Sequence, residues 1–243
     1  MEAAGIIPAR YDSSRFKGKV LEKIKGKPLL WYVFQKAKEA KLLDEIIIAT
    51  DDKRIRRVAE RFGAKVEMTD SNLATGTDRI AQVAESLHSD VIVNIQGDEP
   101  LIHPPLIDEL IQKLYEDPSL NIVTAVYRTN KKSALDNPNV VKVVKSKDDF
   151  ALYFSRSLIP YPRNQKNLYF LKHLGIYAYR RVFLLSYNTL PSSELEEVEG
   201  LEQLRILEYG YKIKVVESKV DSIGVDTPED LEVVKQIMEQ NNA

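Results

Sequence analysis

The 243-residue sequence contains no cysteine and few histidines or glycines. The lack of cysteine excludes a disulfide framework, a thiolate nucleophile, a zinc ribbon and an iron–sulfur cluster. The three histidines, His88, His103 and His173, are too scattered to suggest a metal site. The ten glycines are equally dispersed, and neither the dinucleotide-binding fingerprint nor the Walker A loop occurs. Any phosphate group must therefore be held by side chains.

Net charge and long hydrophobic runs are also lacking. The 35 Lys and Arg residues nearly balance the 36 Asp and Glu residues, which leaves a formal charge of −1. There is thus no global attraction for nucleic acid or anionic lipid, and any anion site must be local. The longest apolar runs, such as Pro28–Phe34, are far shorter than the roughly 18 residues of a membrane span. The apolar stretch before Arg10 is too short for a signal peptide. We therefore expect a cytoplasmic protein with no nucleic-acid or membrane partner.

The first half of the chain alternates short apolar runs with amphipathic segments. This alternation predicts an α/β fold with a doubly wound, mostly parallel sheet. A length of 243 residues fits one large domain, or one domain with an insertion. The expected strands are Ala3–Pro8, Glu45–Thr50, Lys65–Met68 and Asp90–Ile95. The expected helices are Pro28–Ala40, Asp52–Phe62, Asp78–Leu87, with its N-cap at Thr77-Asp78, and Pro104–Tyr115.

After residue 120 the pattern changes to strands without helices of similar length between them. We expect strands at Asn121–Tyr127, Val140–Val144, Phe150–Phe154 and Leu174–Tyr179. Residues 129–190 or so are therefore predicted to form an inserted antiparallel subdomain. The chain is expected to end with a helix at Leu201–Tyr209, a strand at Lys212–Glu217 and a helix from Thr227.

Positive charge is concentrated after the first predicted strand. Arg10, Arg15, Lys17 and Lys19 lie within ten residues of one another, and Gly18 gives the backbone freedom. The bidentate guanidinium of arginine and the compact charge of the lysine ammonium can together neutralise a polyanion. Ligands of open α/β sheets bind outside the carboxyl ends of the strands, where this loop is expected. The loop is either a phosphate-binding loop or an ordinary solvated loop, and the residues alone leave both open.

Carboxylates follow the fourth predicted strand, in Gln-Gly-Asp-Glu-Pro at residues 96–100. A buried strand that runs into Asp98, with Gly97 allowing a turn, places carboxylates at the sheet edge. Mg²⁺ takes one or two carboxylates and completes its shell with phosphate and water. This favours a metal site slightly over a charged turn. Asp226 offers a second carboxylate, but the acids and Pro228 around it are typical of a helix start, so the pattern alone favours a capping role.

Other segments are ambiguous when taken singly. Thr50 and Asp51 end the second strand and either face a ligand or cap the next helix, with capping favoured. The turn Gly76-Thr77-Asp78-Arg79 either binds an anion with its free N–H groups or simply caps a helix. His173 fits a structural histidine, and Glu202 with Arg205 fits an exposed i,i+3 pair.

In order, these segments resemble a known family. The sequence is similar to the 3-deoxy-manno-octulosonate cytidylyltransferases, or CMP-Kdo synthetases, over about residues 4–235. The segments that carry the resemblance are Ile6–Arg10 with Ser14, Arg15 and Lys19, then Ala49–Asp51, Gly76–Arg79, Asn94–Pro100, Ala151–Arg156, His173–Tyr177, Leu201–Arg205 and Gly224–Asp230. Gln-Gly-Asp-Glu-Pro and Leu-Glu-Gln-Leu-Arg are quite specific, whereas Pro-Ala-Arg is shared with sialic acid cytidylyltransferases.

The resemblance implies a Mg²⁺-dependent reaction of CTP with 3-deoxy-manno-octulosonate (Kdo) in a cytoplasmic homodimer, which supplies lipopolysaccharide synthesis. It implies a nucleotide-diphospho-sugar transferase-like sheet, with the inserted subdomain serving dimerisation and sugar binding. Asp98 and Asp226 would bind the metal and act in catalysis with Lys19 and Arg10. The CTP site implied is Arg10, Arg15, Lys19, Thr50, Asp51, Gly76, Thr77, Arg79 and Asp98. The sugar site implied is Gln96, Arg156, His173, Tyr177, Glu202 and Gln203.

One residue departs from the family pattern. Lys17 stands where the family usually has proline, which affects the stiffness of the first loop.

Other functions are alternatives to this one. An enzyme that activates a related acidic sugar with CMP, such as an 8-amino-Kdo analogue or sialic acid, would differ from a Kdo enzyme by very few pocket contacts. A nucleotide-sugar-dependent glycosyltransferase usually carries Asp-x-Asp, which does not occur here. The presence of both Asp98 and Asp226 argues against a non-catalytic nucleotide-binding module.

Overall fold

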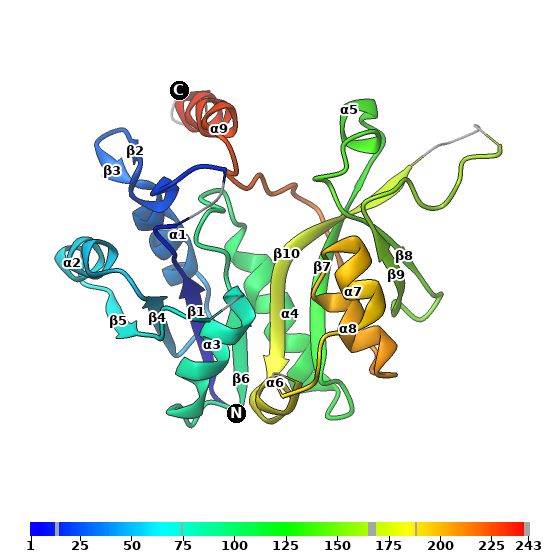
Figure 1. Cartoon of the computed structure of the whole chain (residues 1–243), viewed down its shortest axis with the longest axis horizontal. Helices are drawn as coiled ribbons and strands as arrows, with labels where there is room; N and C mark the ends of the chain where they lie inside the picture. Colours follow the sequence, from blue (N-terminus) through cyan, green and yellow to red (C-terminus); the bar gives the residue numbers. More distant parts are fainter. Residues whose placement is uncertain (13–14, 74, 165–168, 188, 241–243) are drawn as a thin grey trace.

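A single nine-stranded sheet organises the protein in the computed structural model, which describes residues 1–12, 15–73, 75–164, 169–187 and 189–240. Ser13, Ser14 and Ala74 lie outside these residues. Along its main path the strand order is β11-β7-β10-β6-β1-β4-β5, and β8 and β9 extend from β10 (Figure 1). No helix in the described part of the chain is both long and apolar enough to cross a membrane.

The elements of the first half lie close to their predicted positions. The strands β1 (Ala3–Pro8), β4 (Glu45–Thr50) and β5 (Lys65–Met68) have the expected bounds, and β6 is Val91–Asn94. The helices are α1 (Leu29–Lys38), α2 (Lys53–Arg61), α3 (Gly76–Glu85) and α4 (Pro104–Glu116). Between β1 and α1 lie a 3₁₀ helix, η1 (Lys19–Leu21), and a small hairpin of β2 (Lys23–Ile24) and β3 (Lys27–Pro28).

The second half contains the longest strand and several short helices. Its strands are β7 (Ile122–Thr129), β8 (Lys142–Lys145), β9 (Ala151–Ser155), β10 (Phe170–Arg180) and β11 (Lys214–Ser218). Its helices are α5 (Lys132–Leu135), α6 (Arg181–Tyr187), α7 (Glu194–Glu199), α8 (Gln203–Glu208) and α9 (Pro228–Gln240). The helices α5, α6 and α7 and the β2–β3 hairpin were not expected from the sequence.

The pairing of the strands confirms the predicted fold class. β1 pairs in parallel with both β4 and β6, β4 with β5, and β11 with β7. β10 lies between β6 and β7 and is antiparallel to both, and its other end pairs with the antiparallel β8–β9 hairpin. The antiparallel strands are therefore continuous with the central sheet. The single long strand β10 links the two regions.

Helices cover both faces of the sheet, and each face has its own hydrophobic core. Successive residues of β1 point to opposite faces, so that Ile7 packs in the core with α1, α2, α4 and α9, and Ile6 packs in the core with α3, α6 and α8. This gives three layers, helices on sheet on helices (Figure 1), with α9 contributing to the same core as α1. Such a sheet leaves the carboxyl ends of its parallel strands free for a ligand.

One helix start was predicted incorrectly. The N-cap of α3 is Thr75, two residues before the expected Thr77-Asp78 cap. The Asp78 amide donates to Thr75 Oγ1 at 3.1 Å, and the Thr75 amide donates to Asp78 Oδ2 at 2.9 Å. Asp78 thus serves as the third helical residue of a capping box. Thr77 is consequently a helical residue, and it lines a cavity described below.

Candidate active site

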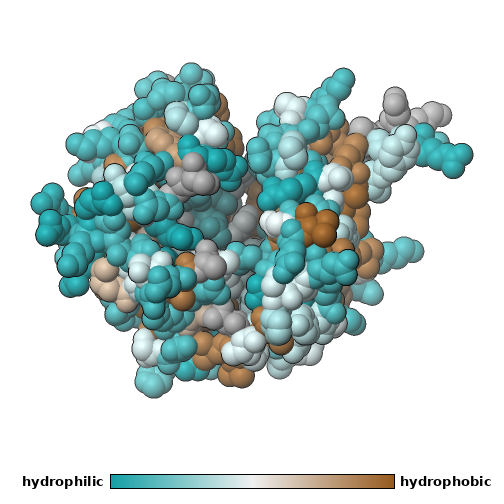
Figure 2. All heavy atoms as spheres, viewed as in Figure 1, coloured by the Kyte–Doolittle hydropathy of each residue, from teal (hydrophilic) through white to brown (hydrophobic). Residues whose placement is uncertain are grey.

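The candidate active site lies where the direction of strand order reverses. From β1 the chain adds β4 and β5 on one side and then places β6 on the other side. The loops after β1 and β6 therefore diverge from adjacent strand ends, which is the usual ligand position in open α/β sheets. Two cavities open here, and Gly76 and Gln96 line both of them. In Figure 2 a groove runs between the two halves of the molecule, and its rims are mostly hydrophilic.

The first cavity, of about 300 Å³, lies over the ends of β1 and β6, and we call it the basic-loop cavity. Its lining residues are Pro8, Arg10, Asp12, Lys19, Val20, Gly76, Gln96, Gly97 and Asp98. Backbone packing at its floor is very tight, because a Cβ on Gly97 would lie 2.6 Å from the Pro8 carbonyl oxygen. Only glycine lets the loop after β6 pass this close to the end of β1.

A single ammonium group, from the lining residue Lys19, joins the lining carboxylate of Asp98 to the nearby carboxylate of Asp226. Lys19 Nζ donates to Asp98 Oδ2 at 2.6 Å and to Asp226 Oδ1 at 2.9 Å. Arg15 lies 3.1 Å from the other oxygen of Asp226. Burial by itself would lower the pKa of Lys19, but the charge and hydrogen bonds of Asp98 and then Asp226 outweigh it and raise the pKa above its ordinary value. The two carboxylates, 128 residues apart in sequence, therefore converge on one cation-binding point.

The connector from β11 to α9 carries Asp226 to this point (Figure 1). The Val225 amide donates to the Asp98 carbonyl oxygen at 2.9 Å, which ties the connector to the loop after β6. The cap bonds of α9 are made by Thr227, whose Oγ1 accepts from the Asp230 amide at 3.2 Å. The preference for Asp226 as a cap was therefore wrong, and its carboxylate instead faces Lys19.

The donor set at this point suits a hard divalent cation. The described residues contain no group of three or more His, Asp or Glu side chains that could hold a metal on their own. Mg²⁺ does not need such a group, because it binds through one or two carboxylates together with phosphate and water. Asp98 and Asp226, which already converge on one cation, fit that requirement.

Lys17, the departure from the family pattern, does not reach the carboxylates. Its ammonium lies 2.9 Å from Asp12 Oδ1, and both side chains are mostly exposed. It also lies over the Tyr11 ring, whose centroid is 3.3 Å from the Arg54 guanidinium carbon. Tyr11 thus contacts two cations at the rim of the loop.

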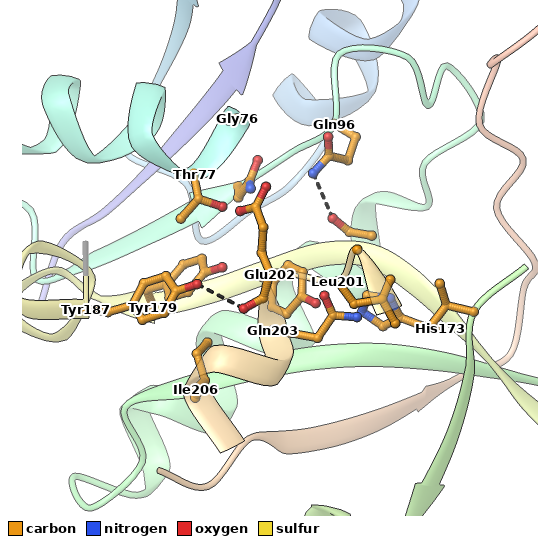
Figure 3. A pocket seen from close by; sticks show the side chains of 15 residues that line it. Gly76, Thr77, Gln96, His173, Tyr179, Tyr187, Leu201, Glu202, Gln203 and Ile206 are labelled. Atoms are coloured by element: carbon orange, nitrogen blue, oxygen red, sulfur yellow. Dashed lines mark hydrogen bonds between the residues drawn. The ribbon is translucent and has the colours of Figure 1, made fainter. Parts of the chain in front are cut away.

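The second cavity, of about 260 Å³, is polar and aromatic, and we call it the aromatic cavity (Figure 3). It lies between the start of α3, the β10 strand and the start of α8. Its lining residues are Gly76, Thr77, Asn94, Gln96, Val141, His173, Gly175, Tyr177, Tyr179, Tyr187, Gly200, Leu201, Glu202, Gln203 and Ile206. Five of the six residues implied for sugar binding are therefore brought together, the exception being Arg156.

The register of β10 shifts between Leu174 and Tyr177, and this bulge shapes the cavity wall. Gln96 Nε2 donates to the Gly175 carbonyl oxygen in the bulge at 3.0 Å, as Figure 3 shows. A Cβ on Gly175 would lie 3.4 Å from Gln96 Cγ and 3.3 Å from Glu99 Oε1. The missing side chain thus lets the loop after β6 rest against β10.

Glu202, the N-cap of α8, and Gln203, its first residue, line the cavity. In Figure 3 the Glu202 side chain points toward Thr77 across the cavity. Burial raises the pKa of Glu202, with the Thr77 hydroxyl opposing the shift. The expected Glu202–Arg205 pair is not formed, since Arg205 Nε instead donates to Glu196 Oε2 at 2.6 Å. Burial likewise raises the pKa of Tyr177 and of Tyr179 well above the ordinary value, so both phenols remain neutral hydrogen-bond donors.

His173 is a neutral imidazole on the cavity wall. Its Nε2 lies 3.0 Å from Thr124 Oγ1, and burial lowers the pKa of His173 to about 3. An uncharged ring can donate or accept one hydrogen bond toward a ligand without adding charge.

The buried His173 makes stability depend on pH in one direction. Below about pH 6.5 the unfolded chain protonates this ring while the folded chain keeps it neutral, so the free energy of unfolding falls as pH decreases. The contribution is at most about 1.4 kcal/mol per pH unit between roughly pH 6 and pH 4. Denaturant unfolding at several pH values should therefore show a shallower pH dependence for His173→Gln than for wild type. Equal slopes would show that His173 titrates normally in the fold.

Other residues implied by the resemblance lie around the cavities without lining them. Arg79, fully buried, donates to Asp51 Oδ2 at 3.0 Å and to the Thr69 hydroxyl, and so joins α3 to the end of β4. Thr50 Oγ1 accepts from the Asp52 amide at 3.2 Å. The Arg156 guanidinium donates to the carbonyl oxygens of Glu199, Pro138 and Gly200 at 2.7 to 3.1 Å. These contacts support the walls of the site.

Sequence reasoning missed three polar side chains that line the aromatic cavity, those of Asn94, Tyr179 and Tyr187. Tyr179 and Tyr187 face Glu202, and the Tyr187 hydroxyl donates to the Glu202 carbonyl oxygen at 3.0 Å (Figure 3). Asn94 is the last residue of β6. A polar residue at the end of an otherwise apolar strand was the available signal for Asn94. Nothing in the sequence marked Tyr187, because α6 was not expected.

The site combines a basic loop at the switch point of an α/β sheet with a carboxylate pair and a second polar cavity, an arrangement suited to a nucleotidyltransferase. A family model described as Cytidylyltransferase matches residues 4–213. The chain belongs to this family.

Relatives and a solved structure match along the whole chain. The 3-deoxy-manno-octulosonate cytidylyltransferase of Fusobacterium nucleatum is 48% identical over 243 residues, which cover 100% of this chain and 99% of the relative. The protein of the same name from Geotalea daltonii is 49% identical over 245 residues, covering 96% of this chain and 97% of the relative. A structure of CMP:2-keto-3-deoxy-manno-octonic acid synthetase complexed with CTP matches with a TM-score of 0.94 at 42% identity, covering 99% of this chain and 100% of that one.

Proposed function

We propose that this enzyme transfers CMP from CTP to the anomeric hydroxyl of Kdo and releases pyrophosphate. The observation that carries the proposal is the meeting of two cavities at Gly76 and Gln96, one lined by Arg10, Lys19 and Asp98, the other polar and aromatic. The hydroxyl oxygen forms a bond to the α-phosphorus, the bond from that phosphorus to the bridging oxygen breaks, and the hydroxyl proton is lost. The relatives and the solved structure support CTP and Kdo as the substrates.

The basic-loop cavity is the part of the site proposed for the triphosphate. Arg10 and Lys19 line it, and Arg15 lies beside Asp226. Their charges would offset the negative charge of the triphosphate and orient the α-phosphorus, which is most of what phosphoryl transfer requires from a protein. Gly76 and Thr77 belong to the adjoining wall, with Thr50, Asp51 and Arg79 supporting it from behind.

Asp98 and Asp226 would hold Mg²⁺. When bound, the ion supplies positive charge that offsets the repulsion of two anionic substrates and stabilises the leaving pyrophosphate. Lys19 touches both carboxylates. Its place between them and the rest of the basic loop suits it to hold a phosphate oxygen next to the metal-binding residues.

The aromatic cavity is the part proposed for the sugar acid. Gln96, Gln203 and the neutral phenol of Tyr177 offer hydrogen-bond donors, and the neutral His173 adds no charge. Glu202 can accept hydrogen bonds from sugar hydroxyls. Arg156 adds positive charge just behind Gly200, because its guanidinium lies 3.1 Å from the Gly200 carbonyl oxygen.

Pyrophosphate release from CTP and Mg²⁺ tests the proposal and its alternative together. We expect rapid release with Kdo, and release at least about tenfold slower, by kcat/KM, with an 8-amino-Kdo analogue or with sialic acid. A chain that favours one of these two sugars would show that the alternative acidic sugar is the substrate. No release with any of the three would reject the enzymatic proposal. A reaction lacking CTP and a reaction lacking the sugar are the controls.

The assembly and cellular role follow from the same resemblance. We place the reaction in the cytoplasm, where its product would feed lipopolysaccharide synthesis, and we propose a homodimer. The β8–β9 region and the segment after it expose the large apolar side chains of Leu152, Tyr161 and Tyr169. Such exposed side chains in the inserted subdomain suit a contact between two copies of the chain. Sedimentation of the wild type and of Leu152→Asp would measure how much Leu152 contributes to the proposed dimer contact.

A further inference from the structure

Asn94 is a cavity residue with an unused hydrogen-bonding atom. It lines the aromatic cavity and is 2% exposed. Its Oδ1 is buried and has no hydrogen-bond partner among the described residues. Most buried polar atoms are paired, and an unpaired one is costly, so a residue that carries one calls for an explanation.

Packing does not explain an asparagine at this position. The preceding residues of β6, Val91, Ile92 and Val93, are apolar and fully buried. Asn94 pairs with Ile6 of β1 on one side and with Tyr177 of β10 on the other, directly beside the β10 bulge. An apolar side chain would continue the strand at lower cost. The amide therefore serves the cavity rather than the core.

Asn94 lines only one of the two cavities. Gly76 and Gln96 line both cavities, whereas Asn94 lines the aromatic cavity and is not among the residues around the basic loop. An oxygen acceptor repels phosphate and carboxylate oxygens but accepts a hydrogen bond from a hydroxyl group. The unpaired Asn94 oxygen is therefore suited to a hydroxyl group of a ligand in the aromatic cavity.

We propose that Asn94 Oδ1 accepts a hydrogen bond from a hydroxyl group of the sugar acid and thereby selects the sugar. This inference rests on the proposed function, because it assigns the aromatic cavity to the sugar. A site built to bond one hydroxyl discriminates strongly against an analogue that lacks it, since the buried acceptor is then left unpaired. Asn94 is thus a specificity-determining residue for the sugar.

The test compares wild type with Asn94→Leu, and with Asn94→Ala in case the larger apolar side chain does not fit. We expect the KM for Kdo to rise about tenfold or more, while the KM for CTP changes less than about twofold. We also expect the melting temperature of Asn94→Leu to stay equal or rise, because an unpaired buried acceptor has been removed. Asn130→Leu, which alters an exposed asparagine after β7, should change none of these values.

Kdo analogues that each lack one hydroxyl make the test specific. One of these analogues should bind the wild-type protein about tenfold more weakly than Kdo binds it. For Asn94→Leu, the same analogue and Kdo should bind with equal affinity. A rise in the KM for CTP instead, an unchanged KM for Kdo, or the absence of any such analogue would overturn the assignment. If wild type released no pyrophosphate with Kdo, the proposed function would fail separately. Calorimetric titration of Kdo would then still compare the two proteins, and equal affinities would reject the role of Asn94.

Discussion

Replacing Asp98 with asparagine is expected to lower kcat by about a thousandfold or more while the protein stays folded. Asparagine keeps the size of the side chain but removes the charge that faces Asp226 and Lys19. A bound metal ion supplies several kcal/mol of transition-state stabilisation, and about 4 kcal/mol corresponds to a thousandfold. The fold does not depend on this charge, because the link to the connector uses the Asp98 backbone carbonyl. Pyrophosphate release and circular dichroism measure the two effects.

Asp12→Asn is the matched control for Asp98→Asn. Asp12 lines the same cavity, but it pairs with the exposed Lys17 and makes no contact with the carboxylate pair in the described structure. We expect its turnover to stay within about threefold of wild type. Wild-type turnover in Asp98→Asn, or an equal loss in both variants, would contradict a metal-binding role for Asp98.

Replacing Gly97 with alanine is expected to damage both stability and catalysis. The new Cβ would lie 2.6 Å from the Pro8 carbonyl oxygen, a backbone atom that cannot move without displacing the end of β1. Overpacking of this kind typically costs about 1–3 kcal/mol. The displacement would also move Asp98, the next residue, and should lower kcat by about a hundredfold. Denaturant unfolding and pyrophosphate release measure the two losses.

Gly76→Ala is the matched control for Gly97→Ala, because it adds the same methyl group at a position without tight packing. At Gly76 the nearest atom to an added Cβ is Pro8 Cγ at 3.6 Å, an ordinary van der Waals contact. This variant should therefore unfold within about 0.5 kcal/mol of wild type, as changes without a structural penalty usually do. Equal stability of both alanine variants would show that the chain tolerates a side chain at Gly97.

Most strands of the first half could be predicted from the sequence because they are short, largely apolar runs between polar turns, β5 with its Lys-Val-Glu-Met sequence being the exception. Glu45–Thr50 is such a run, and its predicted bounds are those of β4. β10 was expected only over Leu174–Tyr179, although it spans Phe170–Arg180. Lys172 and His173 break the apolar pattern there, and their partners lie on strands distant in the sequence. Long-range pairing of this kind has no local signature.

The helices that the sequence analysis missed also differ in whether local residues or distant contacts determine them. The α7 helix carries a local signal, a capping box of Ser193 and Glu196, which the sequence displays as Ser-x-x-Glu. The α6 helix follows β10 directly and contains the apolar Phe183 and Leu184, which are equally compatible with a strand until the core around them is known. Its position is set by packing against the sheet rather than by its own residues.

The functional residues were predictable where a motif marked them and unpredictable where the fold brings separate segments together. Asp98 stood out at the end of an apolar strand. Asp226 looked like a helix cap, and only the folded connector shows its carboxylate facing Lys19. Arg79 was expected at an anion site, but it is fully buried against Asp51. A sequence pattern does not distinguish a cation that waits for a ligand from one that holds two elements together.

Phosphorus NMR of one reaction mixture tests the central claim most directly. With CTP, Mg²⁺ and Kdo present, attack at the α-phosphorus must yield pyrophosphate and one new phosphodiester signal in equal amounts. Neither signal should form when Mg²⁺ or Kdo is left out. Formation of CDP and orthophosphate, or of pyrophosphate together with free CMP and no phosphodiester, would contradict transfer of CMP to the sugar.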